Sequence, residues 1–392
     1  MRKTFKYRLY PNKTTEKNLY FVLNRCRELY NAALSERKDA YRMAGKSITY
    51  FDQQHDLPEI KHEIRPEYED IAAHVLQDVL NRLHKAFQNF FRRCKNGENP
   101  GYPRFQGSSR YNSFTYPDGA GWKFDGTHLH LSKIGSIRVK LHRKLEGTIK
   151  TVTLKREVDH WYVSFSCEVE EPEKLPVSYE DVGIDLGVSH LATLSTGEMI
   201  EHPRYYRKAK KVLEQRQQSL SRKKRGSHRR DKARKLVGKA HRKVANQRRD
   251  FLHKETRSLV NRFQVIVFED IQIGNLTKHA KPKQDEKTGQ YLPNGASAKS
   301  GLTKSILDAG WGAFRQLCSV KAAWAGRSIV KVNPRYTSQI CAQCGTVRKK
   351  TLAERWHSCD CGAELDRDVN AAINILWLGI SQLGKRVEAS CL

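Results

Sequence analysis

The chain has 392 residues and a formal net charge of +30, with 72 Lys and Arg against 42 Asp and Glu. This excess of positive charge is larger than solubility requires and predicts salt-sensitive binding to nucleic-acid phosphates. No stretch approaches the roughly 18 apolar residues of a membrane span, and the first residues lack the apolar core of a signal peptide. We therefore expect a protein of the prokaryotic cytoplasm, associated with the nucleoid, rather than a membrane or secreted protein.

The first 98 residues are predicted to contain one strand followed by two long helices. Residues 1–10 alternate basic and apolar side chains, as a strand does. Asn12 or Thr14 could then cap a helix that continues toward Arg42. A second helix is expected over residues 67–94, where Leu, Val and Phe recur at helical spacing.

Three polar residues form a stripe on another face of the second helix. Gln77, Asn81 and Lys85 are spaced four residues apart and therefore lie on one side of the helix. One interpretation is a solvated face. The other is a surface that contacts duplex DNA, because Gln and Asn side chains can read the edge of adenine.

Residues 99–178 change to turn-forming residues and β alternation. Together with the N-terminal strand, these segments predict a β-barrel. Residues 171–176, which contain two prolines, indicate a linker into the next domain. The short strands are expected near residues 113–116, 122–131, 137–141, 149–155 and 160–169.

Three acids in the second half of the chain stand in different local contexts. Asp185 and Glu269 each follow a short run rich in Val and Ile, which predicts two buried strands that present a carboxylate at their ends. Asp368 lies in the first turn of a predicted helix with an apolar stripe. Taken singly, Asp185 could be a turn residue at a strand end, and Asp368 could simply favour the helix dipole.

The order of the three acids, with a basic helical insertion between the first two, instead predicts the metal-binding carboxylates of a RuvC/RNase H-type nuclease. Like charges brought to roughly 4 Å repel by about 4 kcal/mol per pair at an effective dielectric of about 20, so the cluster requires cations. Hard carboxylate oxygens suit Mg²⁺ or Mn²⁺. Two such ions can activate water and stabilise the leaving oxygen of a phosphodiester.

Positive charge is concentrated between residues 201 and 250, which hold 20 Lys or Arg against 4 Asp or Glu. Interleaved Leu and Val indicate helices here, and the charge predicts contact with nucleic acid. A nuclear-localisation or heparin-like patch is the alternative. Beyond this region, a mobile loop near the active site is expected over residues 273–304, a helix over 305–325 and a strand over 328–332. The densest basic clusters contain Arg222, Lys223, Lys224, Arg225, Arg229 and Arg230.

Four cysteines form two short knuckles that fit a structural zinc ribbon. Cys341 and Cys344 are separated by two residues, whereas Cys359 and Cys361 are separated by one, and each pair is followed by Gly. The shortened second pair leaves His357 open as a substitute ligand. The remaining cysteines are expected to be ordinary reduced thiols: Cys26, Cys94, Cys167, Cys318 and Cys391.

Seven motifs extend over nearly the whole chain. They lie at residues 7–11 (YRLYP), 101–105 (GYPRF), 183–187 (GIDLG), 246–253 (NQRRDFLH), 268–270 (FED), 336–341 (YTSQIC) and 366–374 (DRDVNAAIN). In their order and spacing they resemble the TnpB family. Members of this family are RNA-guided nucleases that insertion sequences encode and that are related to the ancestors of type V CRISPR effectors.

The resemblance implies an α+β multidomain fold with a wedge β-barrel, a helical recognition domain, a RuvC nuclease domain and a zinc ribbon. The barrel would comprise residues 1–12 and 99–178, interrupted by the recognition domain at 13–98. The RuvC domain, with its basic helical insertion, would comprise residues 179–338 and 366–392, interrupted by the zinc ribbon at 339–365.

The resemblance also implies the function and the partners. The protein would be an RNA-guided endonuclease of a transposable element, cutting double-stranded target DNA beside a short flanking motif. It would bind a guide RNA from the transposon end. The sequence does not determine the oligomeric state, for which we expect a monomer. Gln77, Asn81 and Lys85 would help to read the flanking motif, and the basic clusters would hold RNA or heteroduplex.

Site residues follow from the resemblance by position. Asp185, Glu269 and Asp368 would be catalytic and bind two Mg²⁺ ions, and Asp366 would cap the last helix instead. One Zn²⁺ ion would be bound by Cys341, Cys344, Cys359 and Cys361.

Three alternatives differ in function. An RNA-guided repressor would bind DNA without cutting it, but the intact set of three acids argues against that interpretation. A CRISPR-associated descendant would have the same chemistry. A transposase with a covalent intermediate would need a Tyr or Ser nucleophile beside a metal-binding His pair, and no such constellation stands out in the sequence.

Overall fold

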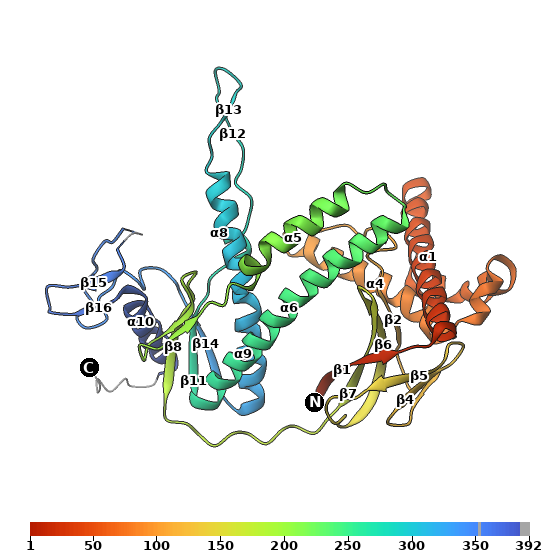
Figure 1. Cartoon of the computed structure of the whole chain (residues 1–392), viewed down its shortest axis with the longest axis horizontal. Helices are drawn as coiled ribbons and strands as arrows, with labels where there is room; N and C mark the ends of the chain where they lie inside the picture. The colour runs from red at the N-terminus through yellow and green to blue at the C-terminus, as the bar shows by residue number, and fades with distance from the viewer. Residues whose placement is uncertain (352–353, 385–392) are drawn as a thin grey trace. The chain divides into compact units, whose positions relative to one another are not determined.

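The computed structural model describes residues 1–351 and 354–384, so Cys391 lies outside the described part of the chain. The chain divides into two compact units, Met1–Glu171 and Pro172–Leu392 (Figure 1). Each unit contains a β-sheet packed against helices, which confirms the predicted α+β fold. Among the described residues, no helix has the length and apolar character needed to cross a membrane.

The sheet of the first unit has seven antiparallel strands in the order β2-β6-β7-β1-β5-β4-β3. The N-terminal strand β1 lies in the middle, where it pairs with β7 on one side and β5 on the other. The strands are β1 (Arg2–Tyr10), β2 (Ser113–Tyr116), β3 (Trp122–Phe124), β4 (His128–Leu131), β5 (Gly135–Lys140), β6 (Thr148–Glu157) and β7 (His160–Glu168).

Side chains draw the two ends of this ladder together. The hydroxyl of Tyr116, at the end of β2, donates to the Ser132 carbonyl beyond β4 at 3.1 Å. Phe124 of β3 packs against Phe165 of β7, which is not its neighbour in the ladder, with ring centroids 5.1 Å apart. The sheet is therefore curled toward the predicted barrel, although its end strands β2 and β3 do not pair with each other in the ladder.

One predicted strand of this sheet is in fact a hairpin. Residues 122–131 form β3 and β4, joined by a tight turn. Asp125 Oδ1 accepts hydrogen bonds from the backbone N–H groups of Thr127 at 2.8 Å and His128 at 2.6 Å, and Gly126 adopts a φ of +100°. The Asp-Gly turn chemistry ends the strand, and the alternation of side chains does not reveal that break.

Two long helices, α1 (Lys13–Ala44) and α4 (Ala73–Lys95), pack on the curled sheet. The Asn12 side chain accepts from Thr15 N at 2.8 Å, so Asn12 rather than Thr14 caps α1. The prediction that the second helix starts at residue 67 is wrong, because the 3-10 helix η2 (Pro66–Asp70) and the extended residue Ile71 precede it. The intervening elements are α2 (Tyr50–His55), α3 (Leu57–Glu59) and the π-helix η1 (Ile60–Ile64).

The sheet of the second unit has five strands in the order β10-β9-β8-β11-β14. β8 (Asp181–Asp185), β11 (Val265–Glu269) and β14 (Ser328–Val332) are parallel, while β9 (His190–Leu194) and β10 (Met199–Glu201) are antiparallel to their neighbours. This mixed sheet is the RNase H-like core predicted for the nuclease domain.

Helices cover both faces of that sheet because successive side chains of β11 point to opposite sides. Ile266 and Phe268 belong to a core that includes Phe314 of α9 (Trp311–Ala325). Val265 belongs to a second core that includes Ile375 of α10 (Arg367–Gln382). Helices α9 and α10 therefore lie on opposite faces of the sheet (Figure 1).

Helix α10 lies unusually close to the two central strands, because glycines stand at the contacts. A Cβ on Gly183 of β8 would be 2.1 Å from the Ala372 carbonyl oxygen, and a Cβ on Gly379 of α10 would be 2.5 Å from Val267 of β11. Gly183 and Val267 are partners in the ladder. The two glycines therefore seat α10 on β8 and β11 together.

Between β10 and β11, helices α5 (Tyr205–Ser221) and α6 (His228–Arg262) form the expected basic insertion. The predicted loop 273–304 is partly structured, with α7 (Ile273–Leu276), β12 (Lys283–Gln284), β13 (Tyr291–Leu292) and the start of α8 (Ala296–Ala309). The helix predicted over 305–325 is two helices, because Gly310 adopts a φ of +75° between α8 and α9. A final hairpin consists of β15 (Trp356–Ser358) and β16 (Glu364–Asp366).

Candidate active centre and cysteine cluster

Asp185 and Glu269 lie at the same edge of the second unit's sheet. Each is the last residue of its strand, and β8 and β11 run parallel with Ile184 opposite Phe268. Ends of neighbouring parallel strands meet at one edge, where sites are commonly built. Asp368 is the second residue of α10, the helix seated on the same two strands. The fold thus gathers three acids that are far apart in the sequence.

The carboxyl group of Asp185 shows the electrostatic consequence of this arrangement. Burial, and then the negative charges of Glu269 and Asp368, raise its pKa to about 8. Burial also raises the pKa of Glu269, whereas the hydrogen bond from Thr337 acts in the opposite direction. At neutral pH the cation-free cluster therefore retains a proton that a bound metal ion would displace.

The same cluster fits a divalent cation chemically. Buried carboxylates are costly unless they are paired with positive charge. Arg367 and Arg355 lie 3.1 Å and 3.9 Å from the two carboxylate oxygens of Asp368. The ion pairs formed among the described residues do not reach Asp185 or Glu269. The carboxyl groups of these two residues therefore lack a positive partner, which Mg²⁺ or Mn²⁺ could provide.

Asp366 caps α10, which confirms the prediction made for it. Its carboxylate accepts hydrogen bonds from Asp368 N at 2.8 Å and from Val369 N at 3.3 Å. The cap fixes the first helical turn. The side chain of Asp368, not that of Asp366, is the one whose charge acts on Asp185.

A buried hydrogen-bond network that none of the sequence motifs predicts holds Glu269. The Thr337 hydroxyl donates to Glu269 Oε1 at 2.5 Å, and both residues are buried. The Asn374 amide of α10 donates to the Thr337 carbonyl at 2.9 Å and to the Ile340 carbonyl at 2.7 Å. The helix that carries Asp368 therefore also holds the residue that orients Glu269.

A second asparagine of α10 extends this network toward the cysteines. The Asn370 side chain donates to the Ile340 carbonyl at 2.8 Å and accepts from Ala342 N at 2.9 Å. Asn370 and Asn374 are buried and stand four residues apart on an otherwise apolar helix face. That spacing is the sequence signal that could have revealed the network.

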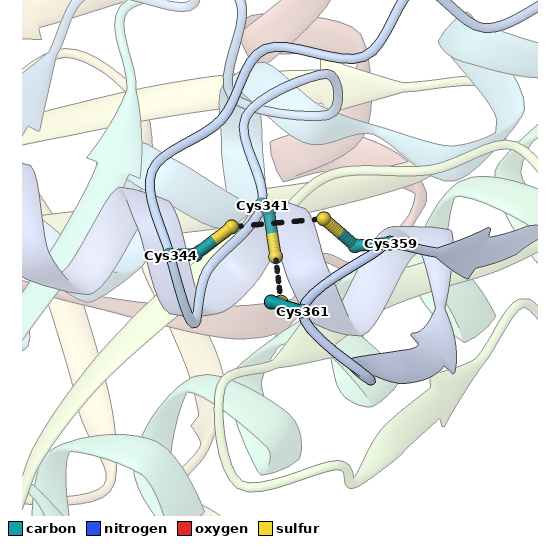
Figure 2. Close-up of side chains that lie close together, drawn as sticks. All are labelled: Cys341, Cys344, Cys359 and Cys361. Atoms are coloured by element: carbon teal, nitrogen blue, oxygen red, sulfur yellow. Dashed lines mark hydrogen bonds between the residues drawn. The ribbon is translucent and has the colours of Figure 1, made fainter.

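The four cysteines of the two knuckles come together in space. Figure 2 shows their side chains directed toward one another, and their Sγ atoms all lie within 4.8 Å of one another. The Sγ atoms of Cys341 and Cys361 are 3.7 Å apart, and those of Cys344 and Cys359 are 3.6 Å apart. A tetrahedral zinc ion with bonds of about 2.3 Å spaces its sulfur ligands by about 3.8 Å, so the four thiols fit zinc.

His357 stands apart from this cluster. It is fully buried, and its Nδ1 contacts the Lys350 ammonium group. Burial, and then the charge of Lys350, lower the pKa of His357 and keep the ring neutral. The shortened second knuckle therefore presents Cys359 and Cys361 to the cluster without help from the histidine.

The residues predicted to contact nucleic acid lie on two separate elements. Gln77 and Asn81 are half-buried on α4, and Lys85 is exposed. Among the residues that the structure describes, their side chains form no hydrogen bond or ion pair. The polar stripe is therefore available for a ligand.

The basic clusters lie in the turn between α5 and α6 and in the first turn of α6, to which Arg229 and Arg230 belong. Arg222 and Arg225 are exposed there, with Lys224 between them. Arg230 differs, because its guanidinium donates to the Leu220 carbonyl at 3.0 Å and the Lys223 carbonyl at 2.8 Å. Arg230 therefore shapes the turn, and its neighbours carry the free charge.

Three family profiles match parts of the chain. Residues 164–280 match the OrfB_IS605 family, described as "Probable transposase", and residues 311–375 match the family described as "Cas12f1-like, TNB domain". Residues 1–46 match a family described as "Helix-turn-helix domain", although in this chain they form the strand β1 and the helix α1.

Similar proteins align over nearly the whole chain. An Escherichia coli (strain K12) protein named "Putative RNA-guided DNA endonuclease InsQ" is 33% identical over 390 residues, covering 98% of this chain and 94% of the relative. A Streptomyces pristinaespiralis protein named "Putative RNA-guided DNA endonuclease" is 34% identical, with 97% and 90% covered. A more distant relative, "CRISPR-associated endodeoxyribonuclease Cas12f1" of Sulfoacidibacillus thermotolerans, is 28% identical over 57% of this chain and 51% of its own.

A solved structure shares the fold. The "Cryo-EM structure of the Cas12f1-sgRNA-target DNA complex" superposes with a TM-score of 0.55 at 13% sequence identity, covering 96% of this chain and 98% of that one. The likeness therefore extends across both units of the chain and agrees with the RNase H-like sheet described above.

Replacing Thr337 by Val should weaken binding of a divalent cation at the acid cluster. The substitution keeps the shape of the side chain but removes the donor that orients Glu269, and loss of such a supporting hydrogen bond typically reduces metal affinity by about 10-fold to 100-fold. Calorimetric titration with Mn²⁺ measures the effect. Thr337→Ser, which retains the hydroxyl, is the matched control, and equal affinity in the Val and Ser variants would contradict the role given to this contact.

Proposed function

The chain belongs to the family of TnpB-like RNA-guided DNA endonucleases, and we propose that it cuts double-stranded DNA matching a bound guide RNA, beside a short flanking motif. The meeting of Asp185, Glu269 and Asp368 at one edge of an RNase H-like sheet carries this proposal. Family membership alone would also be compatible with a protein that only binds DNA. The charges of Glu269 and Asp368 both act on the Asp185 carboxyl group, and this grouping of acids favours hydrolysis.

The three acids would hold two Mg²⁺ or Mn²⁺ ions. Ions bound there supply positive charge that activates water and stabilises the leaving oxygen of a phosphodiester. Asp185 would give up its proton on binding, since neighbouring negative charge is one reason that its pKa is high. Thr337 engages one oxygen of Glu269 and thereby orients the other.

The four cysteines would hold one structural zinc ion. Their spacing supports this assignment, as does the attachment of the first knuckle to α10 through Asn370. Zinc at this position would keep the chain around Thr337 in place, because Thr337 and Cys341 belong to one short segment bound by Asn370 and Asn374. The zinc ribbon would thus support the orientation of Glu269.

Recognition would be divided between RNA and protein. Base pairing with a guide RNA from the transposon end would read the target sequence, while the protein would read backbone shape and the flanking motif. Gln77, Asn81 and Lys85 are proposed for the motif because their side chains form no hydrogen bond or ion pair within residues 1–351 and 354–384, and because amide side chains can read adenine. RNA or heteroduplex phosphates would contact Arg222, Lys223, Lys224 and Arg225 in the turn before α6 and Arg229 at the start of α6.

We also propose the division into domains that the family resemblance implies. We assign residues 1–12 and 99–178 to the wedge barrel and residues 13–98 to the recognition domain. The pairing of β1 with β5 and β7 supports the first assignment, because it joins the chain's first strand to the later ones. The remaining residues would form the RuvC domain, at 179–338 and 366–392, and the zinc ribbon, at 339–365.

Glu269→Gln, Asp185→Ala and Asp368→Ala should each lower metal-dependent cleavage of guide-matched DNA by at least about a thousandfold, or about 4 kcal/mol of transition-state stabilisation. Binding of guide and target should persist, because each change removes a metal ligand at the edge of the sheet and none of the three acids belongs to the apolar cores. Cleavage assays with Mg²⁺ and the copurifying RNA test this. The control is Asp270→Asn, which removes a negative charge next to Glu269 but outside the cluster, and equal losses in this variant and Glu269→Gln would refute the assignment.

Metal analysis of the purified protein should find about one zinc ion per chain. Ser at Cys341, Cys344, Cys359 or Cys361 should remove it, because three thiolates leave the tetrahedral site incomplete. His357→Ala should retain the zinc, since the ring lies outside the sulfur cluster. Retention of zinc by Cys359→Ser together with its loss from His357→Ala would show that the histidine is the ligand instead.

A further inference from the structure

A basic pocket lies beside the carboxyl end of β8 in the second unit. It has a volume of about 240 Å³ and is lined by Val188, by His202 and Arg204 just before α5, by the beginning of α5 and by one stretch of α8. Val188 follows Asp185 by three residues, and three residues span at most about 11 Å. One wall of the pocket is therefore close to the acid cluster.

Four cationic side chains line the pocket, and most of their charge is uncompensated. Lys210 pairs with Glu214 at 3.7 Å. Within the described ranges, Arg204, Arg207 and Lys304 form no ion pair with a carboxylate. The charge around the pocket is therefore positive and available to an anion.

Among the described residues that line the pocket, Asp308 is the one acid, and it is already engaged. The side chain is buried and lies 2.8 Å from the guanidinium of Arg248 on α6. Its two oxygens also accept from the backbone N–H groups of Tyr206 at 3.0 Å and Arg207 at 3.3 Å. Asp308 thus compensates Arg248 and the first turn of α5, and among the described residues Arg204, Arg207 and Lys304 remain without a carboxylate partner.

The same contacts hold the pocket in a fixed shape. Arg204 has a φ of 51° and a ψ of 46°, a left-handed conformation that is uncommon for residues other than glycine. The His202 ring accepts from Arg204 N at 3.2 Å and helps to keep this backbone in place. Burial, together with the charges of Arg204 and Arg248, lowers the pKa of His202. Strained backbone held by its surroundings is typical of binding sites.

We propose that this pocket binds a phosphate of the DNA strand being cut, close to the phosphodiester that enters the acid cluster. The inference rests on the proposed function, and it adds a positioning site that determines which bond of the strand reaches Asp185. Whatever its base sequence, the DNA strand carries a phosphate one or a few nucleotides from the cut, and this anion would lie beside the acid cluster. Fixed cations in a preformed site suit backbone contacts that are independent of sequence.

The test compares two double variants that remove the same charge from the same two helices. Arg207→Ala/Lys304→Ala removes two lining cations, whereas Lys208→Ala/Lys299→Ala removes two lysines outside the lining. Each is combined with Asp185→Ala and loaded with guide RNA. The probe is a short single-stranded DNA without complementarity to the guide, so that base pairing contributes nothing.

Loss of two phosphate contacts should flatten the slope of log affinity against log salt by about 1.4, at about 0.7 per contact on a single strand. The slope of the Lys208→Ala/Lys299→Ala variant should equal that of the protein in which none of these four residues is changed. The charge-conserving variant Arg207→Lys/Lys304→Arg should keep the original slope. A change seen only in the Ala variant is then due to loss of charge and not to misfolding. Equal slopes in the two Ala variants would overturn the proposal.

Two further measurements separate the possible causes of failure. A flattened slope for the guide RNA itself, with no change for the DNA, would assign the pocket to the guide and overturn the proposal. In the cleavage-competent protein, the pocket variant should raise KM for guide-matched DNA and scatter the position of the cut. If the unmodified protein failed to cut such DNA, the proposed function would be wrong, and the binding slopes would still decide whether the pocket holds a DNA phosphate.

Discussion

The mutual repulsion of three carboxylates is the constraint on which the rest of this structure depends. Asp185, Glu269 and Asp368 would avoid one another in a flexible chain, and burial makes their repulsion stronger. The parallel register of β8 and β11 places two of the acids, and the glycine contacts at Gly183 and Gly379 seat α10 so that the third joins them. The close packing of helix on sheet thus supplies the rigidity that a cluster of like charges requires. The raised pKa of Asp185 reflects its burial and the repulsion from Glu269 and Asp368.

The acid cluster and the cysteine cluster share one hydrogen-bonded frame. Asn370 and Asn374 on α10 hold the segment from Thr337 to Ala342, which carries the contact to Glu269 at one end and Cys341 at the other. Side-chain amides can bind donors and acceptors of a backbone at once, so a single helix face secures both sites. A zinc ion would therefore stabilise more than its own ribbon, because the segment that it closes also orients an acid of the active centre.

Sequence patterns were sufficient to predict the structural features that depend on residues close together in the chain. Strand-end acids such as Asp185, the helix cap Asp366 and the cysteine knuckles are visible as short motifs, and apolar periodicity located most helices and strands. Breaks inside regular patterns were missed, as at Gly310, where a positive φ divides one predicted helix into two. Contacts between distant segments were missed as well. Thr337 meets Glu269 across 68 residues, and Asp308 meets Arg248 across 60, so neither partner leaves a local trace.

Titration of the Asp185 carboxyl group tests the central claim most directly. Carbon-13 NMR of protein labelled at the aspartate carboxyl carbons, with Asp185→Asn used to assign the signal, follows this group alone. In the metal-free protein we expect a midpoint near pH 8, which falls when Glu269 is changed to Gln and falls further when Mg²⁺ is added. A midpoint near 4, the ordinary value for Asp, that responds neither to the substitution nor to Mg²⁺ would show that the three acids do not form one metal-binding cluster.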